Sequence, residues 1–127
     1  MTENEIATQV VDVAFKIHKL YGPGLLESVY ETIMAYELRK RGFYVVQQQP
    51  LPVVHENVRM NLGFRPDLVI EGKVIVEVKS LELVAPVHKK QLLTYLRVAD
   101  KRLGLLINFG QALIKDEVWR VVNKLLE

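Results

Sequence analysis

The sequence predicts an α+β fold, within the broad α/β class, in which two helices come first, antiparallel strands follow, and a helix and a strand close the chain. Three observations predict it: helical periodicity over residues 3–20 and 25–41, β-branched and aromatic residues after Phe43, and helical spacing again after Pro86. With 127 residues, half of them hydrophobic, the chain is long enough for one core. We therefore expect a single domain over residues 1–127.

The first two helices have recognisable ends. Thr2 and Glu5 are spaced as a capping box, and apolar residues then recur on one helical face, at Ile6, Val10, Val13, Ala14, Ile17 and Leu20. The tetrapeptide "YGPG" at 21–24 breaks this helix, and "LLESVYETIMAYELRKR" is helical until Gly42 ends it. We expect Gly24 to serve the backbone between the helices, because glycine readily takes a positive φ.

The middle and end of the chain alternate between strand and helix patterns. The segments "FYVVQQQ", "LPVVHENVRMNLGFRPDLVI" and "KVIVEVKS", with turn signals at "HEN" and "EG", predict a meander of three or more strands. The run "VHKKQLLTYLRVAD" has helical spacing through Leu92, Tyr95, Leu96 and Ala99. The apolar "LGLLINF" then predicts a strand, and "EVWRVVNKLLE" fits either a strand or a helix.

Composition excludes several kinds of chemistry. The chain has no cysteine, which rules out disulfides, thiolate zinc sites and cysteine nucleophiles. His18, His55 and His88 are too scattered for a local metal motif, so we expect surface or capping histidines and carboxylates as the metal ligands. The acidic amino terminus does not read as a signal peptide, and an uninterrupted apolar run of about 18 residues is lacking. These features favour a cytoplasmic protein without a membrane span.

Basic residues cluster although the net charge is only +2. The clusters are Lys16, His18 and Lys19; Arg39, Lys40 and Arg41; Lys89 and Lys90; and Arg97, Lys101 and Arg102. They fit contacts to phosphates, and equally the solvated faces of ordinary helices.

A charged hairpin, "RPDLVIEGKVIVEVKS", stands out in this apolar region. Side chains alternate along a strand, so Glu77 and Lys79 share one face, about 7 Å apart. The turn decides whether Asp67 joins them. A two-residue loop at Glu71 and Gly72 would turn Asp67 away from Glu77, whereas a three-residue loop over 70–72 would bring it opposite Ile75 and diagonal to Glu77.

Converged carboxylates point to a metal ion. Two charges about 5 Å apart repel by roughly 3 kcal/mol at an effective dielectric near 20. A divalent cation removes that cost, and carboxylate oxygens suit Mg²⁺ or Mn²⁺, which take one or two protein carboxylates together with water and phosphate. The alternative is a half-exposed strand whose acid and base face solvent.

The same residues resemble the bipartite motif of the PD-(D/E)XK nuclease superfamily, with "PD" at Pro66 and Asp67 and "EVK" at Glu77, Val78 and Lys79. Upstream, "GLLESVY" at 24–30 reads GxxExxY, the signature of a small family assigned to that superfamily. Downstream, Gln91 and Tyr95 have the QxxxY spacing found in several of its nucleases. The resemblance covers residues from about 15 to 122.

This resemblance implies a restriction-endonuclease-like αβββαβ core, with a mixed sheet flanked by helices. It also implies Mg²⁺, with Mn²⁺ as a substitute, held by Asp67, Glu77, the Val78 carbonyl and Glu27, and a catalytic set of Asp67, Glu77, Lys79, Glu27, Gln91 and Tyr95. Glu27 also fits a first-turn glutamate stabilised by the helix dipole, and Gln91 and Tyr95 also fit packing at the edge of the core.

The expected function is metal-dependent hydrolysis of phosphodiester bonds in nucleic acid, with DNA as the expected substrate, by an endonuclease or exonuclease acting as a possible homodimer. The sequence leaves the choice between DNA and RNA open. Lys79 would orient or deprotonate the attacking water, or stabilise the developing negative charge. One alternative is a catalytically silent module that binds nucleic acid or a protein partner. Another is a structural subunit of an obligate oligomer, with an apolar patch around Trp119 and "VVNKLLE".

Overall fold

The computed structural model describes residues 1–60 and 64–125, and its elements follow the order that the sequence predicts. They are α1 (Glu3–Tyr21), α2 (Glu27–Lys40), β1 (Val45–Gln47), β2 (Val53–His55), β3 (Val58–Met60), β4 (Leu68–Ile70), β5 (Val74–Lys79), α3 (Pro86–Ala99), β6 (Leu103–Asn108) and β7 (Val118–Val122). Part of the long strand segment predicted before β4, residues 61–63, lies outside the described residues. In the ranges 1–60 and 64–125, no helix has the length and apolar character that crossing a bilayer requires.

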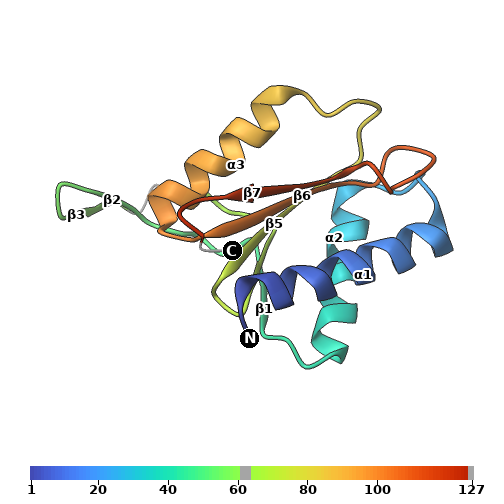
Figure 1. Cartoon of the computed structure of the whole chain (residues 1–127), viewed down its shortest axis with the longest axis horizontal. Helices are drawn as coiled ribbons and strands as arrows, with labels where there is room; N and C mark the ends of the chain where they lie inside the picture. The colour runs from blue at the N-terminus through green and yellow to red at the C-terminus, as the bar shows by residue number, and fades with distance from the viewer. Residues whose placement is uncertain (61–63, 126–127) are drawn as a thin grey trace.

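A mixed sheet in the order β1-β4-β5-β6-β7 forms the centre of the described structure. The neighbours are antiparallel except β5 and β6, which are parallel. Helices α1 and α2 cover one face of the sheet and α3 covers the other, while β2 and β3 form a separate hairpin that projects from the body (Figure 1). The elements α2, β1, β4, β5, α3 and β6 give the predicted αβββαβ order, and the ambiguous final segment contains a strand.

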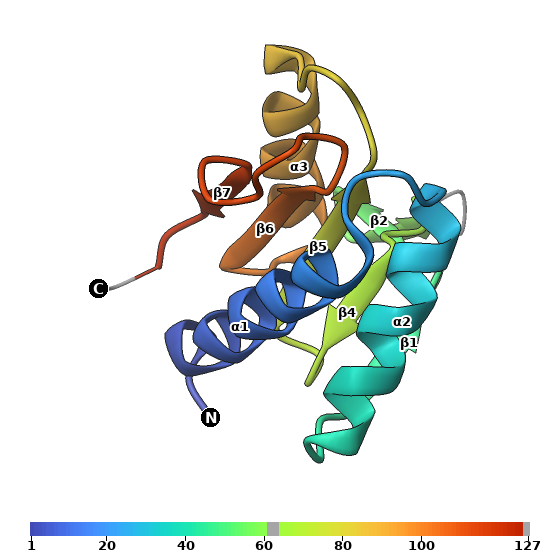
Figure 2. The same ribbon diagram turned by 90° about the vertical axis from the view of Figure 1, so that its right-hand side faces the viewer.

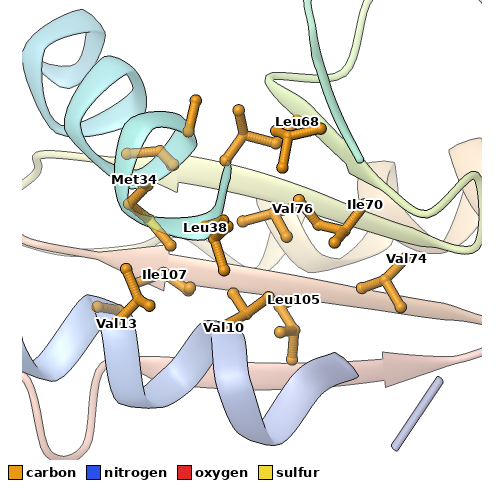
Figure 3. Packing of buried hydrophobic residues seen from close by; sticks show 14 of the residues in the cluster. Val10, Val13, Met34, Leu38, Leu68, Ile70, Val74, Val76, Leu105 and Ile107 are labelled. Carbon is orange, nitrogen blue, oxygen red and sulfur yellow. The ribbon is translucent and has the colours of Figure 1, made fainter. Parts of the chain in front are cut away.

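Alternation along β5 divides the core between the two faces. Val74, Val76 and Val78 are buried in the cluster beneath α1 and α2, whereas Ile75 belongs to the cluster beneath α3. In Figure 3, residues of α1 and α2 such as Val10 pack against this first face of the sheet. Glu77 and Lys79 therefore lie on the α3 side of the sheet, at the carboxyl end of β5.

Helix α1 begins and ends as its caps dictate. The Thr2 hydroxyl accepts the Glu5 N–H at 3.2 Å and the Glu5 carboxylate accepts the Thr2 N–H at 3.2 Å, which confirms the capping box. At the other end, Gly22 takes a φ of 68° and donates its N–H to the His18 carbonyl. The expectation for Gly24 was wrong, because the positive φ falls on Gly22. Leu20, predicted on the apolar face, is exposed beyond the edge of the core.

The β4–β5 turn is a three-residue connection, but one residue later than predicted. Leu68 pairs with Val76 and Ile70 with Val74, so the connection is 71–73. Glu71 and Gly72 have positive φ values, and the Lys73 N–H donates to the Ile70 carbonyl at 2.9 Å. Extending this register one step places Asp67 directly opposite Glu77 rather than opposite Ile75. The expected convergence on one face is retained.

A buried asparagine fixes the chain immediately after the charged strand. Asn108, at the end of β6, is fully buried. Its Oδ1 accepts the N–H groups of Leu81 at 2.8 Å and Gly110 at 3.1 Å, and its amide nitrogen donates to the Leu81 carbonyl at 2.9 Å and to the Glu117 carboxylate at 2.9 Å. A Cβ on Gly110 would lie 2.3 Å from the Leu81 carbonyl oxygen. Backbones this close leave room only for glycine at 110.

Replacing Gly110 by alanine should therefore lower the free energy of unfolding by roughly 1–3 kcal/mol or more, because the Leu81 backbone must move. Urea denaturation followed by circular dichroism measures this change. Gly24→Ala is the matched control: a Cβ there meets nothing within 4 Å, so we expect a change within about 0.5 kcal/mol. Equal stability of the two variants would contradict the close approach at Gly110.

Candidate functional site

Two carboxylates meet where β4 begins and β5 ends. Asp67 directly precedes β4, and Glu77 lies on β5 in the position opposite. The Asp67 Oδ2 accepts the Val78 N–H at 2.7 Å, and the Glu77 Oε1 accepts the Asp67 N–H at 3.4 Å. Both side chains are half-buried. The two adjacent strands thus hold these carboxylates as a pair.

The surroundings disfavour the charged form of Glu77. Burial, the largest cause, and the neighbouring Asp67 carboxylate together raise the pKa of the Glu77 carboxyl to about 8, although the Lys79 ammonium partly offsets them. Lys79 is half-buried two residues along the same face of β5. Near neutral pH the Glu77 carboxyl therefore largely carries a proton, and a bound cation would take the place of that proton.

A third carboxylate, Glu31 of α2, was missed by the sequence reasoning. Glu31 is buried and accepts amide hydrogen bonds from Gln47 at 3.0 Å and Gln48 at 2.9 Å. The Gln48 amide also donates to the Asp67 Oδ1 at 3.1 Å, so it bridges the two acids. Burial raises the pKa of the Glu31 carboxyl, and the Asp67 charge adds to this. One signal was available in the sequence: Glu31 lies one helical turn after Glu27, so both carboxylates project from the same side of this helix.

Glu27 reaches the other end of the same region. As the first residue of α2, it places its Oε2 3.4 Å from the Ser80 N–H, one residue beyond Lys79. Glu27 is itself exposed, so its carboxylate reaches the end of β5 from the surface of the molecule. Its position in the first turn also suits the helix dipole.

The QxxxY pair of α3 covers the face that carries Glu77. The Tyr95 ring stacks on Phe64 with centroids 3.9 Å apart. Burial raises the pKa of the Tyr95 hydroxyl, the Glu77 carboxylate also raises it, and a hydrogen bond with Gln91 lowers it. Tyr95 is therefore half-buried and within electrostatic range of Glu77, while Gln91 is exposed one turn earlier.

Two of the three histidines lie at the surface or at a helix end, as the sequence predicts, and the third is buried. His55 is exposed, and the His88 Nδ1 accepts the Ala85 N–H at 3.1 Å at the start of α3, as expected of surface and capping residues. His18 contradicts that expectation, because it is buried and its Nε2 hydrogen-bonds the Gln111 carbonyl at 2.8 Å. It links α1 to the segment after β6.

The donor set fits a hard divalent cation. In the part of the chain that the structure describes, no three His, Cys, Asp or Glu side chains are grouped so as to hold an ion by themselves. Mg²⁺ needs fewer protein ligands, since it keeps several waters and takes one or two carboxylates with substrate phosphate. Asp67, Glu77 and the Val78 carbonyl offer only oxygen atoms, and a cation at this place would stabilise the charged form of Glu77, which burial and the Asp67 carboxylate disfavour.

An acidic pair at one end of a mixed sheet, with a lysine beside it and helices on both faces, defines a nuclease-like α+β protein. A sequence model of the PD-(D/E)XK nuclease superfamily matches residues 4–121, and the chain belongs to this superfamily. One matching solved structure is an alkaline exonuclease from Laribacter hongkongensis, with 14% identity and a TM-score of 0.48. The match covers 71% of this chain and 52% of that one, so this chain spans about half its length. A search of curated proteins finds no match.

The raised pKa of Glu77 predicts how stability depends on pH. The folded chain retains a proton on Glu77 between the usual value of 4.5 and about 8, whereas the unfolded chain loses it, so the free energy of unfolding falls as pH rises through this window. This fall in the free energy of unfolding amounts to at most roughly 4–5 kcal/mol, and Glu77→Gln should abolish it because glutamine does not titrate. Urea denaturation in EDTA at about pH 5 and about pH 8.5 measures the difference.

The exposed Glu82→Gln serves as a control, and it should keep the pH dependence of the parent chain. If Glu77→Gln destabilised the chain equally at both pH values, the carboxyl would not be the protonated group.

Proposed function

We propose that this chain hydrolyses phosphodiester bonds in nucleic acid, with DNA as the expected substrate, and that Mg²⁺ or Mn²⁺ binds at Asp67 and Glu77. The observation that carries the proposal is the placement of these two carboxylates opposite each other on neighbouring strands. Lys79 follows on the same face, and the chain belongs to a superfamily of nucleases. Two half-buried carboxylates that face each other repel, and a bound cation would remove this repulsion.

Assignment to the GxxExxY family is part of the proposal. The last residue of that motif, Tyr30, is fully buried and stacks on Phe109 with ring centroids 4.3 Å apart. Its hydroxyl donates to the Gly22 carbonyl and accepts the Leu25 N–H at 3.1 Å. Tyr30 thereby fixes the connection from which Glu27 reaches the end of β5. These contacts give the tyrosine and the glutamate of the motif distinct, connected roles.

The residues would divide the work as follows. Asp67, Glu77 and the Val78 carbonyl would hold the ion, with Glu27 and Glu31 close enough to add negative charge or to bind its water ligands. When bound, the ion supplies Lewis-acid polarisation of the phosphodiester and lowers the pKa of a coordinated water. Lys79 orients or deprotonates the attacking water, or stabilises negative charge on the phosphate.

The helix α3, which covers the face of the sheet that carries Glu77, would complete the site. Gln91 and Tyr95 lie one turn apart and can donate hydrogen bonds to a phosphate oxygen or to the carboxylate of Glu77. The stacking of Tyr95 on Phe64 limits its motion, so its hydroxyl is held in position before substrate arrives.

The small size of the domain favours recognition of shape, strand ends or strand state, with a homodimer pairing two sites. The basic clusters of the helices would position the backbone. Because the chain has no cysteine, we place it in a reducing compartment, the cytoplasm. From its length, we treat residues 1–127 as a single domain. Endonucleolytic and exonucleolytic attack both fit this arrangement.

A catalytically silent module is the second candidate. The observation that favours it is the occupation of the Asp67 carboxylate by the Val78 N–H and the Gln48 amide. The obligate oligomer is less well supported: Trp119 is half-buried with the Lys89 ammonium 5.0 Å above its ring, so it offers little apolar surface. Residues 126 and 127 of the predicted patch lie outside the described residues.

Metal binding separates the first two candidates. We expect Mn²⁺ to bind the parent chain at one or two sites in calorimetry, and the combined variant Asp67→Asn with Glu77→Gln to lose the heat of binding, because it removes both anionic ligands. Asp116→Asn with Glu56→Gln, at two exposed positions away from the carboxylate pair, is a matched control that should bind as the parent does. Absence of binding in the parent chain would favour the silent module.

Lys79→Ala should reduce cleavage at least about 100-fold, because the ammonium acts on the water or on the phosphate, while Mn²⁺ binding persists. Cleavage of labelled single-stranded and duplex DNA under single-turnover conditions gives the rate. Lys73→Ala, at the turn before the same strand, is the charge-matched control, since its ammonium contacts the Met1 carbonyl at 2.8 Å. Full activity of Lys79→Ala would refute the proposed role.

A further inference from the structure

A hollow of about 560 Å³ lies between the carboxyl end of α1 and the segment that follows β6. Its walls include Phe15, Lys16, Lys19, Gly22, Leu113 and Lys115. Among the described residues that line it, none is acidic. The hollow therefore combines an apolar surface with three ammonium groups, and it is distinct from the carboxylate site.

The three lysines are not equally available. The Lys16 ammonium forms an ion pair with the Asp12 carboxylate at 3.3 Å, and the same carboxylate also pairs with the Arg41 guanidinium. Lys19 and Lys115 are exposed on opposite walls of the hollow. Asp116 follows Lys115 in the chain but does not line the hollow. The hollow therefore has a net positive charge, which suits an anionic ligand.

The apolar walls of the hollow are exposed to solvent. Phe15 is 39% exposed and Leu113 is 77% exposed. An aromatic ring beside ammonium groups is the combination that binds single-stranded nucleic acid, because a base stacks on the ring while the phosphates contact the cations. Duplex DNA keeps its bases stacked inside and would use only the cations.

The floor of the hollow is held in place from below. His18 binds the Gln111 carbonyl at 2.8 Å, and Ile114 is buried in the main core. Phe109 lies 6.3 Å from the His18 ring and stacks on Tyr30. A ligand would therefore meet a formed surface and would not have to order these segments, which lowers the entropic cost of binding.

The hollow is connected to the carboxylate site along the α1–α2 connection. Gly22 lines the hollow, and Leu25 lies further along the same connection. The Leu25 carbonyl accepts the Ser80 hydroxyl at 2.9 Å, and both residues border a second recess with Glu27. In Figure 2 the α1–α2 connection, the segment after β5 and the segment after β6 lie at one end of the molecule. A bound strand could run from Glu27 across this connection to Phe15.

We propose that this hollow binds a single-stranded segment of nucleic acid that leads to or from the carboxylate site. The inference rests on the proposed function for the nature of the ligand, and it narrows the substrate to one with an unpaired segment, such as an overhang or a frayed end. Phe15 stacks on a base, and Lys19 and Lys115 contact phosphates on either side.

The test measures binding of the full chain to a fluorescent oligothymidylate about 12 nucleotides long, in EDTA, by anisotropy at several salt concentrations. We expect Lys19→Ala with Lys115→Ala to weaken binding roughly five- to tenfold and to reduce the salt slope by about 1.4, the value for two phosphate contacts on a single strand. Lys73→Ala with Lys124→Ala removes the same charge from exposed positions outside the basic clusters and should bind as the parent does.

Stacking is tested at Phe15. Phe15→Leu should weaken single-strand binding about fivefold or more, while Phe15→Tyr should retain it, and a blunt duplex should be insensitive to both. Parent-like affinity and salt slope in the double lysine variant would overturn the inference, as would failure of the parent chain to bind single strands. Equal displacement by polyglutamate, without an effect of Phe15→Leu, would also overturn it and would point to an acidic protein partner.

Binding in EDTA is independent of cleavage. A chain that binds the strand through the hollow but fails to cleave it with Mn²⁺ would therefore disprove the proposed hydrolysis while leaving this inference standing.

Discussion

The register of the β4–β5 hairpin is the constraint on which the candidate site depends. A three-residue connection sets Asp67 opposite Glu77, and alternation then puts Lys79 on the same face. A slip of one residue would send Asp67 to the other face of the sheet, under α2, and would leave Glu77 without its partner. The positive φ values of Glu71 and Gly72 and the Lys73 hydrogen bond hold this register. A turn far from the chemistry thus decides whether the chemistry is available.

The candidate site also lowers the stability of the fold. Glu77 and Glu31 are carboxyls whose surroundings favour the neutral form, so their negative charge weakens the folded state until a cation or a hydrogen bond compensates for it. Two glutamine amides donate hydrogen bonds to the Glu31 carboxylate and offset part of this cost. The Asn108 side chain separately fixes the segment beyond Lys79. The apolar faces of β5 and β6 supply the remaining stability, since they are buried on both sides.

Local patterns were sufficient for some of these features and insufficient for others. Helical and strand periodicity predicted the elements and the shared face of Glu77 and Lys79, because side-chain direction follows from the backbone period. The turn remained open between two loop lengths, since the same residues fit both. Glu31 escaped notice because its partner Gln48 is brought beside Asp67 by pairing between β1 and β4, a contact between distant parts of the chain. The burial of His18 likewise depends on a loop more than ninety residues away.

The β2–β3 hairpin belongs to an excursion that leaves the sheet after β1 and returns at β4, two strands that pair with each other. Its two ends are joined where the Gln48 N–H donates to the Asp67 carbonyl at 3.1 Å. An excursion closed at its base can change in length or content without displacing the strands on either side. Its base, however, is made of two residues of the carboxylate cluster. Phe64, within this excursion, stacks on Tyr95, so only the β2–β3 hairpin at its tip is free to vary, and a ligand that pulls on the hairpin would act first on Asp67.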